Sequence, residues 1–225
     1  MGVNVKKRLV LVLTVAALIS AGVTTPSFAG GKKAIAKTTS NISICKNTSA
    51  VGHSPKKLPI PAVNVPHVNR TFTFTTNCGD IVIDADGVNA PLTVIALSYL
   101  AKNGYYDQSL CHRLVTSGIY ILQCGDPTAS GQGGPRFYIP DENLPPASSN
   151  AYPAGTVAMA NAGSGTNGSQ FFITYQDNSQ LASNYTVWGH VTKGLDIIKA
   201  VAAAGNAADG VGPAQVIAIE KVKVK

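Results

Sequence analysis

Two short apolar runs separated by a three-residue turn constrain the fold of this chain more than any other feature. The runs lie within residues 111–115 and 119–126, and Thr116-Ser117-Gly118 lies between them. Short apolar runs on either side of a Ser-Gly turn favour two adjacent antiparallel strands. The chain is therefore expected to contain an antiparallel hairpin, and Arg113 interrupts the apolar character of its first strand.

Further strands are predicted on both sides of this hairpin. Phenylalanines alternate with threonines over residues 71–75, residues 77–80 have turn composition, and residues 81–83 are apolar. This pattern predicts a second hairpin. Valines alternate with lysines over residues 221–225, which predicts a final strand whose lysines oppose edge-to-edge pairing.

Two helices are predicted within this β-rich region. The first begins at Pro91, a residue that the first turn of a helix tolerates, and stops at Gly104. The second covers residues 195–201 and ends near Gly205. Between them lie short apolar runs broken by Gly, Pro and Asn, as in an antiparallel barrel. The fold class is thus mainly β with two α-helices.

The first 29 residues have the composition of an export signal. Basic residues 6–8 precede an apolar run over residues 9–23, and small residues at Ser27 and Ala29 predict cleavage after Ala29. The run is shorter than the roughly 20 residues that span a bilayer, although an uncleaved membrane anchor is the alternative. We expect a secreted or extracytoplasmic protein.

Residues 30–70 are predicted to be a disordered, basic, Pro-containing linker. Residues 1–70 carry ten of the 18 lysines and arginines and none of the 11 acidic residues. The net charge of +7 therefore comes from the leader and the linker. The remainder is mildly acidic, which argues against nucleic-acid binding, while the basic segment could contact an anionic cell envelope.

Four cysteines follow the predicted cleavage site: Cys45, Cys78, Cys111 and Cys124. An even number in an exported protein favours two disulfides, and four cysteines permit three connectivities. Cys111 with Cys124 is preferred, because pairing of the strands around them would bring the two together; Cys45 with Cys78 would then remain. No CxxC pair is present, so no metal site is expected.

Residues with small, amide and aromatic side chains lie close together in the sequence between positions 157 and 173. Asn161 and Gln170 carry amides that donate and accept hydrogen bonds, and Phe172 provides a flat apolar wall. Small residues at Ala160 and Ala162 leave room for another backbone. Together with Arg113, whose guanidinium presents a fixed fork of donors, these residues suit an extended peptide.

Three other interpretations of these residues are possible from the sequence alone. Arg113 could be a strand arginine that points to solvent. The glycine-rich stretch 163–168 could bind phosphate, but it lacks the following Lys-Ser/Thr and the strand-to-helix context of such loops. A serine hydrolase would need a Gly-x-Ser-x-Gly motif and a suitable Ser and Asp partner for His112 or His190, and neither requirement is met.

The order of motifs resembles the cyclophilin family of peptidyl-prolyl cis-trans isomerases. The motifs are, in sequence, His-Arg (112–113), Gln-Cys-Gly-Asp (123–126), Gly-x-Gly-Gly (131–134), Asp-Glu-Asn (141–143), Met-Ala-Asn-Ala-Gly (159–163) and Asn-Gly-Ser-Gln-Phe-Phe (167–172). The resemblance covers residues 71–225. The cysteines, the export leader and the basic segment resemble the actinobacterial exported branch of the family. The family's fold is a closed eight-stranded antiparallel barrel capped by two helices, with the substrate groove on its outer face.

The resemblance also implies residue roles. Arg113 matches the catalytic arginine, and the substrate-binding positions correspond to Tyr120, Ile121, Gln123, Gly131, Ala160, Asn161, Ala162, Gln170, Phe172, Leu181 and Tyr185. Two positions depart from the family pattern. Gln180 stands where the family has a tryptophan used in binding cyclosporin, and Tyr185 replaces a histidine. The interval from Arg113 to Gln123 is also two residues longer than usual.

The implied function is peptidyl-prolyl cis-trans isomerisation, with Pro-containing peptides and unfolded exported proteins as partners. Rotation about an amide needs no cofactor, and none is expected. The missing indole predicts weak cyclosporin binding. The alternative from another class is a Pro-peptide binding module or chaperone with weak or no turnover, which Gln180 and Tyr185 favour and Arg113, Gln123 and Phe172 oppose.

Overall fold

A computed structural model describes residues 44–148 and 150–225. Nine strands and two helices are found there, in the order given by their residue numbers. The strands are β1 (Arg70–Thr76), β2 (Gly79–Ala85), β3 (Ser109–Leu110), β4 (Arg113–Ser117), β5 (Ile119–Cys124), β6 (Thr156–Met159), β7 (Phe171–Thr174), β8 (Val187–Lys193) and β9 (Ala218–Val224), and the helices are α1 (Pro91–Lys102) and α2 (Leu195–Ala203).

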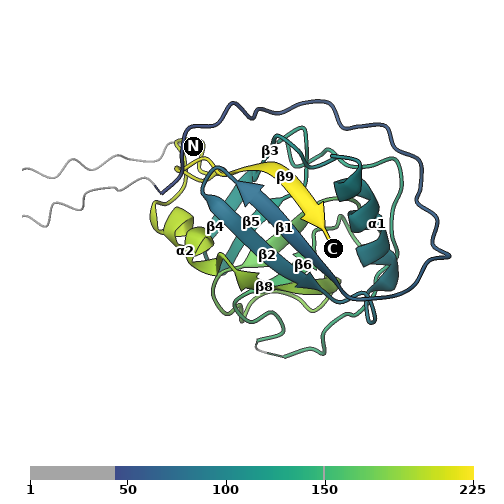
Figure 1. Ribbon diagram of the computed structural model, residues 1–225. Helices are drawn as coiled ribbons and strands as arrows, with labels where there is room; N and C mark the ends of the chain where they lie inside the picture. Colours follow the sequence, from purple (N-terminus) through teal and green to yellow (C-terminus); the bar gives the residue numbers. More distant parts are fainter. Residues whose placement is uncertain (1–43, 149) are drawn as a thin grey trace, which may run out of the picture. The chain divides into compact units, whose positions relative to one another are not determined.

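All strand pairs are antiparallel and belong to one curled sheet. The strand order is β3-β9-β1-β2-β8-β6-β7-β5-β4, and α1 and α2 lie on opposite sides of the domain (Figure 1). The predicted hairpins are present as β1–β2 and β4–β5. The sequence-based expectation of a mainly antiparallel β fold with two helices is confirmed.

The count of strands and the closure of the sheet differ from a regular eight-stranded barrel. The two-residue β3 is the additional strand. In the described residues no strand ladder joins β3 to β4, the two ends of the sheet order. Single hydrogen bonds connect this side instead, from Leu114 N to Val211 O (2.8 Å) and from Cys111 N to Ile217 O (3.0 Å). The irregular segment between α2 and β9 therefore takes the place of a continuous ladder.

The main core lies on the inner face of the sheet. Alternate residues of the strands point inward, so that Phe72, Ile83, Leu122, Val157 and Trp188 are all fully buried there. Phe72 and Trp188 meet edge to face, with ring centroids 5.4 Å apart. Burial of apolar side chains such as these is the main driving force for folding.

The described part of the predicted linker is attached to the domain. Residues 44–69, here named the strap, have no helix or strand. In Figure 1 the strap runs along the domain past α1 before it enters β1. Lys46 N donates to Asn77 O (2.9 Å) and Lys56 Nζ donates to Asn103 O (2.9 Å), while Ala50 is buried and Leu58 packs against the main core. This docking differs from a disordered extension, because apolar and covalent contacts fix an irregular chain.

Both preferred disulfides are present. Cys45 is joined to Cys78 and Cys111 to Cys124, with Cα atoms 4.0 Å apart in each pair. The first pair fixes the strap to the β1–β2 turn. The second joins the residues that flank the paired Arg113 and Gln123.

The predicted leader, its cleavage site and the first part of the predicted linker lie outside the described residues. Among the described ranges, no helix is both long and apolar enough to cross a membrane.

Candidate active site

Arg113, Gln123 and Phe172 lie in one row across three adjacent strands. Arg113 on β4 pairs with Gln123 on β5, Gln123 pairs with Phe172 on β7, and Phe172 pairs with Ala158 on β6. Directly opposed residues point to the same face of a sheet. The neighbouring row is Leu114, Leu122, Ile173 and Val157, which belongs to the buried inner core. The row of Arg113 therefore faces outward.

A chain of hydrogen bonds orients the polar end of this row. Arg113 Nη1 donates to Gln123 Oε1 (3.0 Å), and Gln123 Nε2 donates to Gln170 Oε1 (2.9 Å). Gln170 Nε2 in turn donates to the carbonyl oxygens of Gly131 (3.0 Å) and Gly133 (2.8 Å). Both amides thus have a single consistent orientation. A guanidinium has five N–H donors, so that Arg113 retains donors for a ligand.

An apolar cluster forms the other end of the row. Phe172, Ile121, Ala158 and Tyr152 are buried together, apart from the main core. Leu181 and Tyr185 pack at its edge, and the rings of Phe172 and Tyr185 meet edge to face with centroids 5.4 Å apart. The outer face of the sheet therefore has its own apolar site beside the arginine.

Small residues and backbone groups border the same face. A hollow of about 490 Å³ is lined by six predicted residues, Gln123, Gly131, Ala160, Asn161, Ala162 and Gln170, together with Tyr138 and other residues of the loops around them. Asn161 Nδ2 donates to Asn184 O (3.1 Å), and its Oδ1 accepts from Gly163 N (3.2 Å). The asparagine is held both by its own loop and by the segment that carries Tyr185.

Tyr120 is the predicted substrate-binding residue that the structure does not bring to this face. Alternate residues of β5 point to opposite faces of the sheet, so Tyr120 points away from the face that carries Ile121 and Gln123. It packs at the edge of the main core. Its ring meets Tyr175 edge to face at 6.0 Å, and its backbone N–H donates to Asn178 Oδ1 (2.7 Å).

Two residues to which the sequence analysis gave no role, Tyr152 and Asp126, organise the site. The hydroxyl oxygen of buried Tyr152 accepts from Tyr185 N (2.9 Å) and lies 3.2 Å from Ala182 O, so it fixes the segment that carries Leu181 and Tyr185. Nothing in the local pattern around this tyrosine marks it as structural. Asp126 could have been found from the Thr, Ser and Gly residues that follow it, which are typical of a turn around a carboxylate.

Asp126 holds the loop that carries Gly131 and Gly133 through hydrogen bonds to its backbone. Its carboxylate accepts from the backbone N–H groups of Thr128 (2.8 Å), Gly131 (2.7 Å) and Gly133 (3.0 Å). Burial raises the pKa of the Asp126 carboxyl, but these hydrogen bonds and that of the Thr128 hydroxyl outweigh burial and leave the pKa below its ordinary value. The carboxylate is charged at neutral pH.

His112 lies directly before Arg113 but has no catalytic partner. Burial lowers the pKa of its imidazole, and Arg113 lowers it further against the opposing effect of Asp126. Neither ring nitrogen has a hydrogen-bond partner in the described residues. The serine-hydrolase interpretation therefore receives no support from His112.

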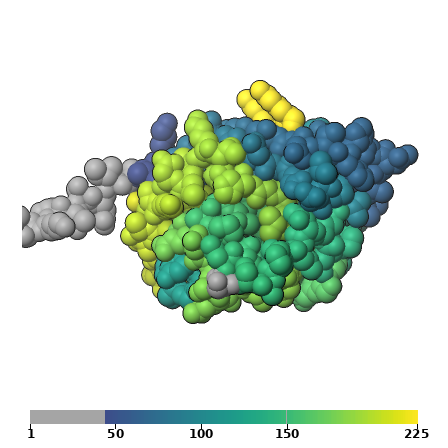
Figure 2. Space-filling view, turned by 90° about the horizontal axis from the view of Figure 1, so that it is seen from below, coloured from purple at the N-terminus to yellow at the C-terminus, as the bar shows by residue number. Residues whose placement is uncertain are grey.

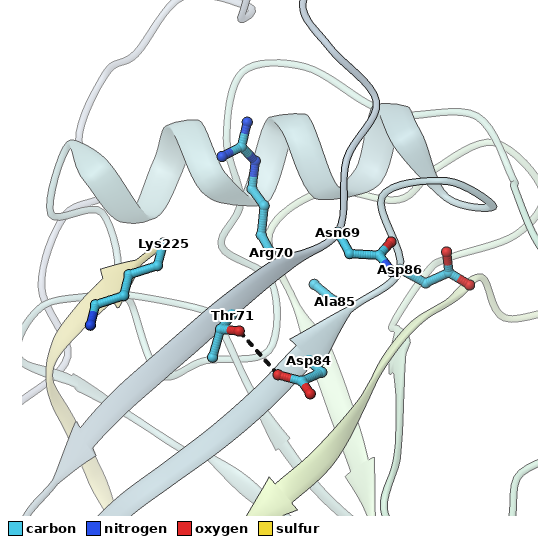
Figure 3. Close-up of a pocket in the computed structure, with 7 residues that line it drawn as sticks. All are labelled: Asn69, Arg70, Thr71, Asp84, Ala85, Asp86 and Lys225. Atoms are coloured by element: carbon cyan, nitrogen blue, oxygen red, sulfur yellow. Dashed lines mark hydrogen bonds between the residues drawn. The ribbon is translucent and has the colours of Figure 1, made fainter.

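A second surface hollow lies at the ends of β1 and β2 (Figure 3). It is lined by Asn69, Arg70, Thr71, Asp84, Ala85, Asp86 and Lys225. Thr71 Oγ1 donates to Asp84 Oδ1 (3.1 Å). The side chains of Arg70, Asp86 and Lys225 point away from one another in Figure 3. These charges do not converge on a common point, which leaves the outer face of β4, β5 and β7 as the candidate site.

The candidate site is thus an arginine beside an outer apolar pocket, on the face of a curled antiparallel sheet with two helices. The sequence profile described as "Cyclophilin type peptidyl-prolyl cis-trans isomerase/CLD" matches residues 71–224. The chain belongs to this cyclophilin family.

Relatives and solved structures agree with this assignment. Proteins named "Probable peptidyl-prolyl cis-trans isomerase B" are 38% identical over 68% of the chain in Mycobacterium leprae and 39% identical over 69% in Mycobacterium tuberculosis H37Rv. They agree with the expected resemblance to an actinobacterial branch. The chain spans about half the length of these relatives, 56% and 54%.

A solved structure shares the fold. The cyclophilin type isomerase of Cryptosporidium parvum is 28% identical, with a TM-score of 0.62, and the match covers 70% of this chain and 98% of that one. The same Cryptosporidium protein was also solved in the presence of the dipeptide Ala-Pro, with a TM-score of 0.61 and 29% identity.

Proposed function

We propose that this chain is a peptidyl-prolyl cis-trans isomerase that binds X-Pro segments along the outer face of β4, β5 and β7. The observation that carries this proposal is the shared row of Arg113 and Phe172. The two residues are separated by one strand, so that their backbones lie roughly 10 Å apart, or two strand spacings. This distance suits a prolyl ring on Phe172 and a donor at the adjoining amide.

The reaction requires a groove that favours a twisted amide. An X-Pro bond prefers trans by only about 0.5–1 kcal/mol, yet rotation faces a barrier of roughly 18–20 kcal/mol from amide resonance. The catalyst therefore has to bind the twisted form better than either planar form. No covalent bond is broken, and the work falls on placement and hydrogen bonding.

The residues of the groove divide this work between them. Phe172, Leu181 and Tyr185 hold the proline ring in apolar surroundings. Arg113 donates towards the proline carbonyl or to the nitrogen as it becomes pyramidal. Because Gln123 already holds the guanidinium (3.0 Å), little reorganisation is needed when the amide twists, which is the condition for strong transition-state stabilisation.

The clients we propose are exported proteins. The leader-like residues 1–29 with cleavage after Ala29 support a secreted or extracytoplasmic location, and the two disulfides suit an oxidising compartment. Proline isomerisation takes tens of seconds and can limit folding there. The basic residues before the domain support contact with an anionic envelope, which elution by salt would test.

A single experiment separates an isomerase from a binding module. Turnover of an X-Pro peptide and affinity for the same peptide are measured on one sample of the protein. We expect turnover well above the uncatalysed rate. Binding without acceleration would instead support the binding-module alternative, for which the departures at Gln180 and Tyr185 are the specific observation.

A further inference from the structure

The strap contacts one end of the loop that borders the candidate groove. This loop, here named the groove loop, covers residues 126–137. His53 N donates to Pro127 O (2.8 Å). The strap backbone at Gly52 passes so close that a Cβ atom there would lie 2.4 Å from Thr128 O. Only a glycine fits this approach. Gly52 and His53 of the strap therefore hold the start of the groove loop at Pro127 and Thr128.

The strap also reaches the other end of the groove loop. Strap residues 57–60 line one surface hollow together with Arg136 and Phe137. Leu58 packs against the main core, and Phe137 is itself buried in that core. Both ends of the groove loop therefore adjoin the strap, while the disulfide from Cys45 to Cys78 fastens the beginning of the strap.

The middle of the groove loop is connected to the arginine. The carbonyl oxygens of Gly131 and Gly133 accept from Gln170, Gln170 accepts from Gln123, and Gln123 accepts from Arg113. Each step is a hydrogen bond of 2.8–3.0 Å. A shift of the two glycine carbonyls would remove the partners that orient both amides. The guanidinium would then lose its fixed direction.

We propose that the strap is a positioning element of the isomerase groove. Residues 52–60 hold the groove loop, and the loop holds Arg113 through Gln170 and Gln123. No strap residue has to contact the peptide for this role. The catalytic unit would then begin near Cys45 rather than at Thr71. This inference rests on the proposed function, since the arginine is the catalytic residue in both.

The test uses Gly52→Val in the full chain. The added side chain collides with Thr128 O and displaces the strap from the groove loop. We expect kcat to fall roughly 10-fold, because even small misplacement of a catalytic group is costly. KM should change less than kcat, since the apolar cluster around Phe172 that holds the proline ring does not include the groove loop. The side-chain amide NMR signals of Gln123 and Gln170 should move.

The matched control is Val51→Thr, because Val51 is the exposed neighbour of Gly52. It should leave kcat and both glutamine signals unchanged. An active wild type whose Gly52→Val variant keeps kcat within two-fold, with unmoved glutamine signals, would overturn the strap proposal. An inactive wild type would contradict the proposed function itself. If Gly52→Val does not fold, His53→Pro removes the donor to Pro127 without adding bulk at Thr128, and the same outcomes apply.

Discussion

Arg113 donates to Gln123 across the β4–β5 ladder, with 3.0 Å between Nη1 and Oε1. The two residues are directly opposed, so the backbone register sets their distance before the side chains make any contact. The disulfide between Cys111 and Cys124 closes the same end of the hairpin. The guanidinium is therefore fixed by ladder, side chain and covalent bond together.

Replacement of this arginine should remove most of the activity. Arg113→Ala is expected to lower kcat/KM roughly 10²–10³-fold, the usual cost of removing one preorganised donor. Arg70→Ala is the matched control, because Arg70 also begins a strand but lies on β1. A peptide isomerisation assay measures both variants. Near-wild-type activity of Arg113→Ala would contradict its catalytic role.

Tyr152 should matter more for stability than its single hydroxyl suggests. Tyr152→Phe leaves the backbone N–H of Tyr185 without its acceptor (2.9 Å). We expect a loss of roughly 1–3 kcal/mol in the free energy of unfolding, the cost of an unsatisfied buried group. Urea titration measures it, with Tyr138→Phe as control, because Tyr138 is 70% exposed. Equal stability of the two variants would argue against this role.

The Cys111–Cys124 disulfide should stabilise the fold and hold the arginine's end of the hairpin. The two cysteines are 13 residues apart, and a loop of this length corresponds to roughly 3 kcal/mol in the chain-entropy model. The double variant Cys111→Ala with Cys124→Ala should lose about this much in urea titration. A non-reducing peptide map of the wild type checks the pairing: a free Cys111 or Cys124 would contradict this disulfide, and a free Cys45 would contradict the Cys45–Cys78 bond.

The groove loop should be sensitive to acid. Since the pKa of folded Asp126 is below its ordinary value of 3.8, its contribution to stability is complete above that value. This stabilisation is lost as the pH falls through the lower pKa that Asp126 has in the folded protein. Asp126→Asn should therefore be less stable than wild type at pH 7, and the difference should shrink below about pH 4.

The control for this pH series is Asp80→Asn, because the Asp80 side chain makes no hydrogen bond in the part of the chain that the structure describes. Thermal unfolding at several pH values measures the difference. A stability gap between wild type and Asp126→Asn that stays constant from pH 7 to pH 3 would rule out the carboxylate as its source.

Cyclosporin should bind weakly. Gln180, which the family resemblance aligns with a tryptophan, is exposed, and a Cβ on Gly118 would lie 3.6 Å from its Oε1. The glutamine thus lies beside the lengthened β4–β5 turn and offers no indole donor. Gln180→Trp should strengthen inhibition. A wild-type inhibition constant as low as that of a tryptophan-bearing cyclophilin would contradict this prediction.

The residues of the site that lie on regular strands could be predicted from the sequence. The family resemblance implies the roles of Arg113, Gln123 and Phe172, and the register of the strands explains why the three share a face. Tyr120 differs from these three residues, because its place among the substrate-binding positions comes from counting family positions back from Gln123. Such a count does not take into account that alternate residues of a strand point to opposite faces.

Contacts between distant segments could not be read from local patterns. The strap has the composition of a linker, rich in Pro, Lys and Ser and without periodicity. Its docking depends on the approach of Gly52 to Thr128 and on a disulfide to Cys78. Tyr152 is similar, since its role depends on a backbone group 33 residues away. No property of the neighbouring sequence signals such partners.

The disulfide between Cys45 and Cys78 also determines how the domain would respond to a mechanical load. The strap enters β1, and without a cross-link a pull on the N-terminal side would peel β1 from β2 and β9. With the bond in place, force applied before Cys45 reaches the β1–β2 turn at Cys78 directly, 33 residues further along the chain. The residues between the two cysteines carry no tension. A domain tethered by its N-terminal segment would thus keep the strap after Cys45 and β1 free of tension.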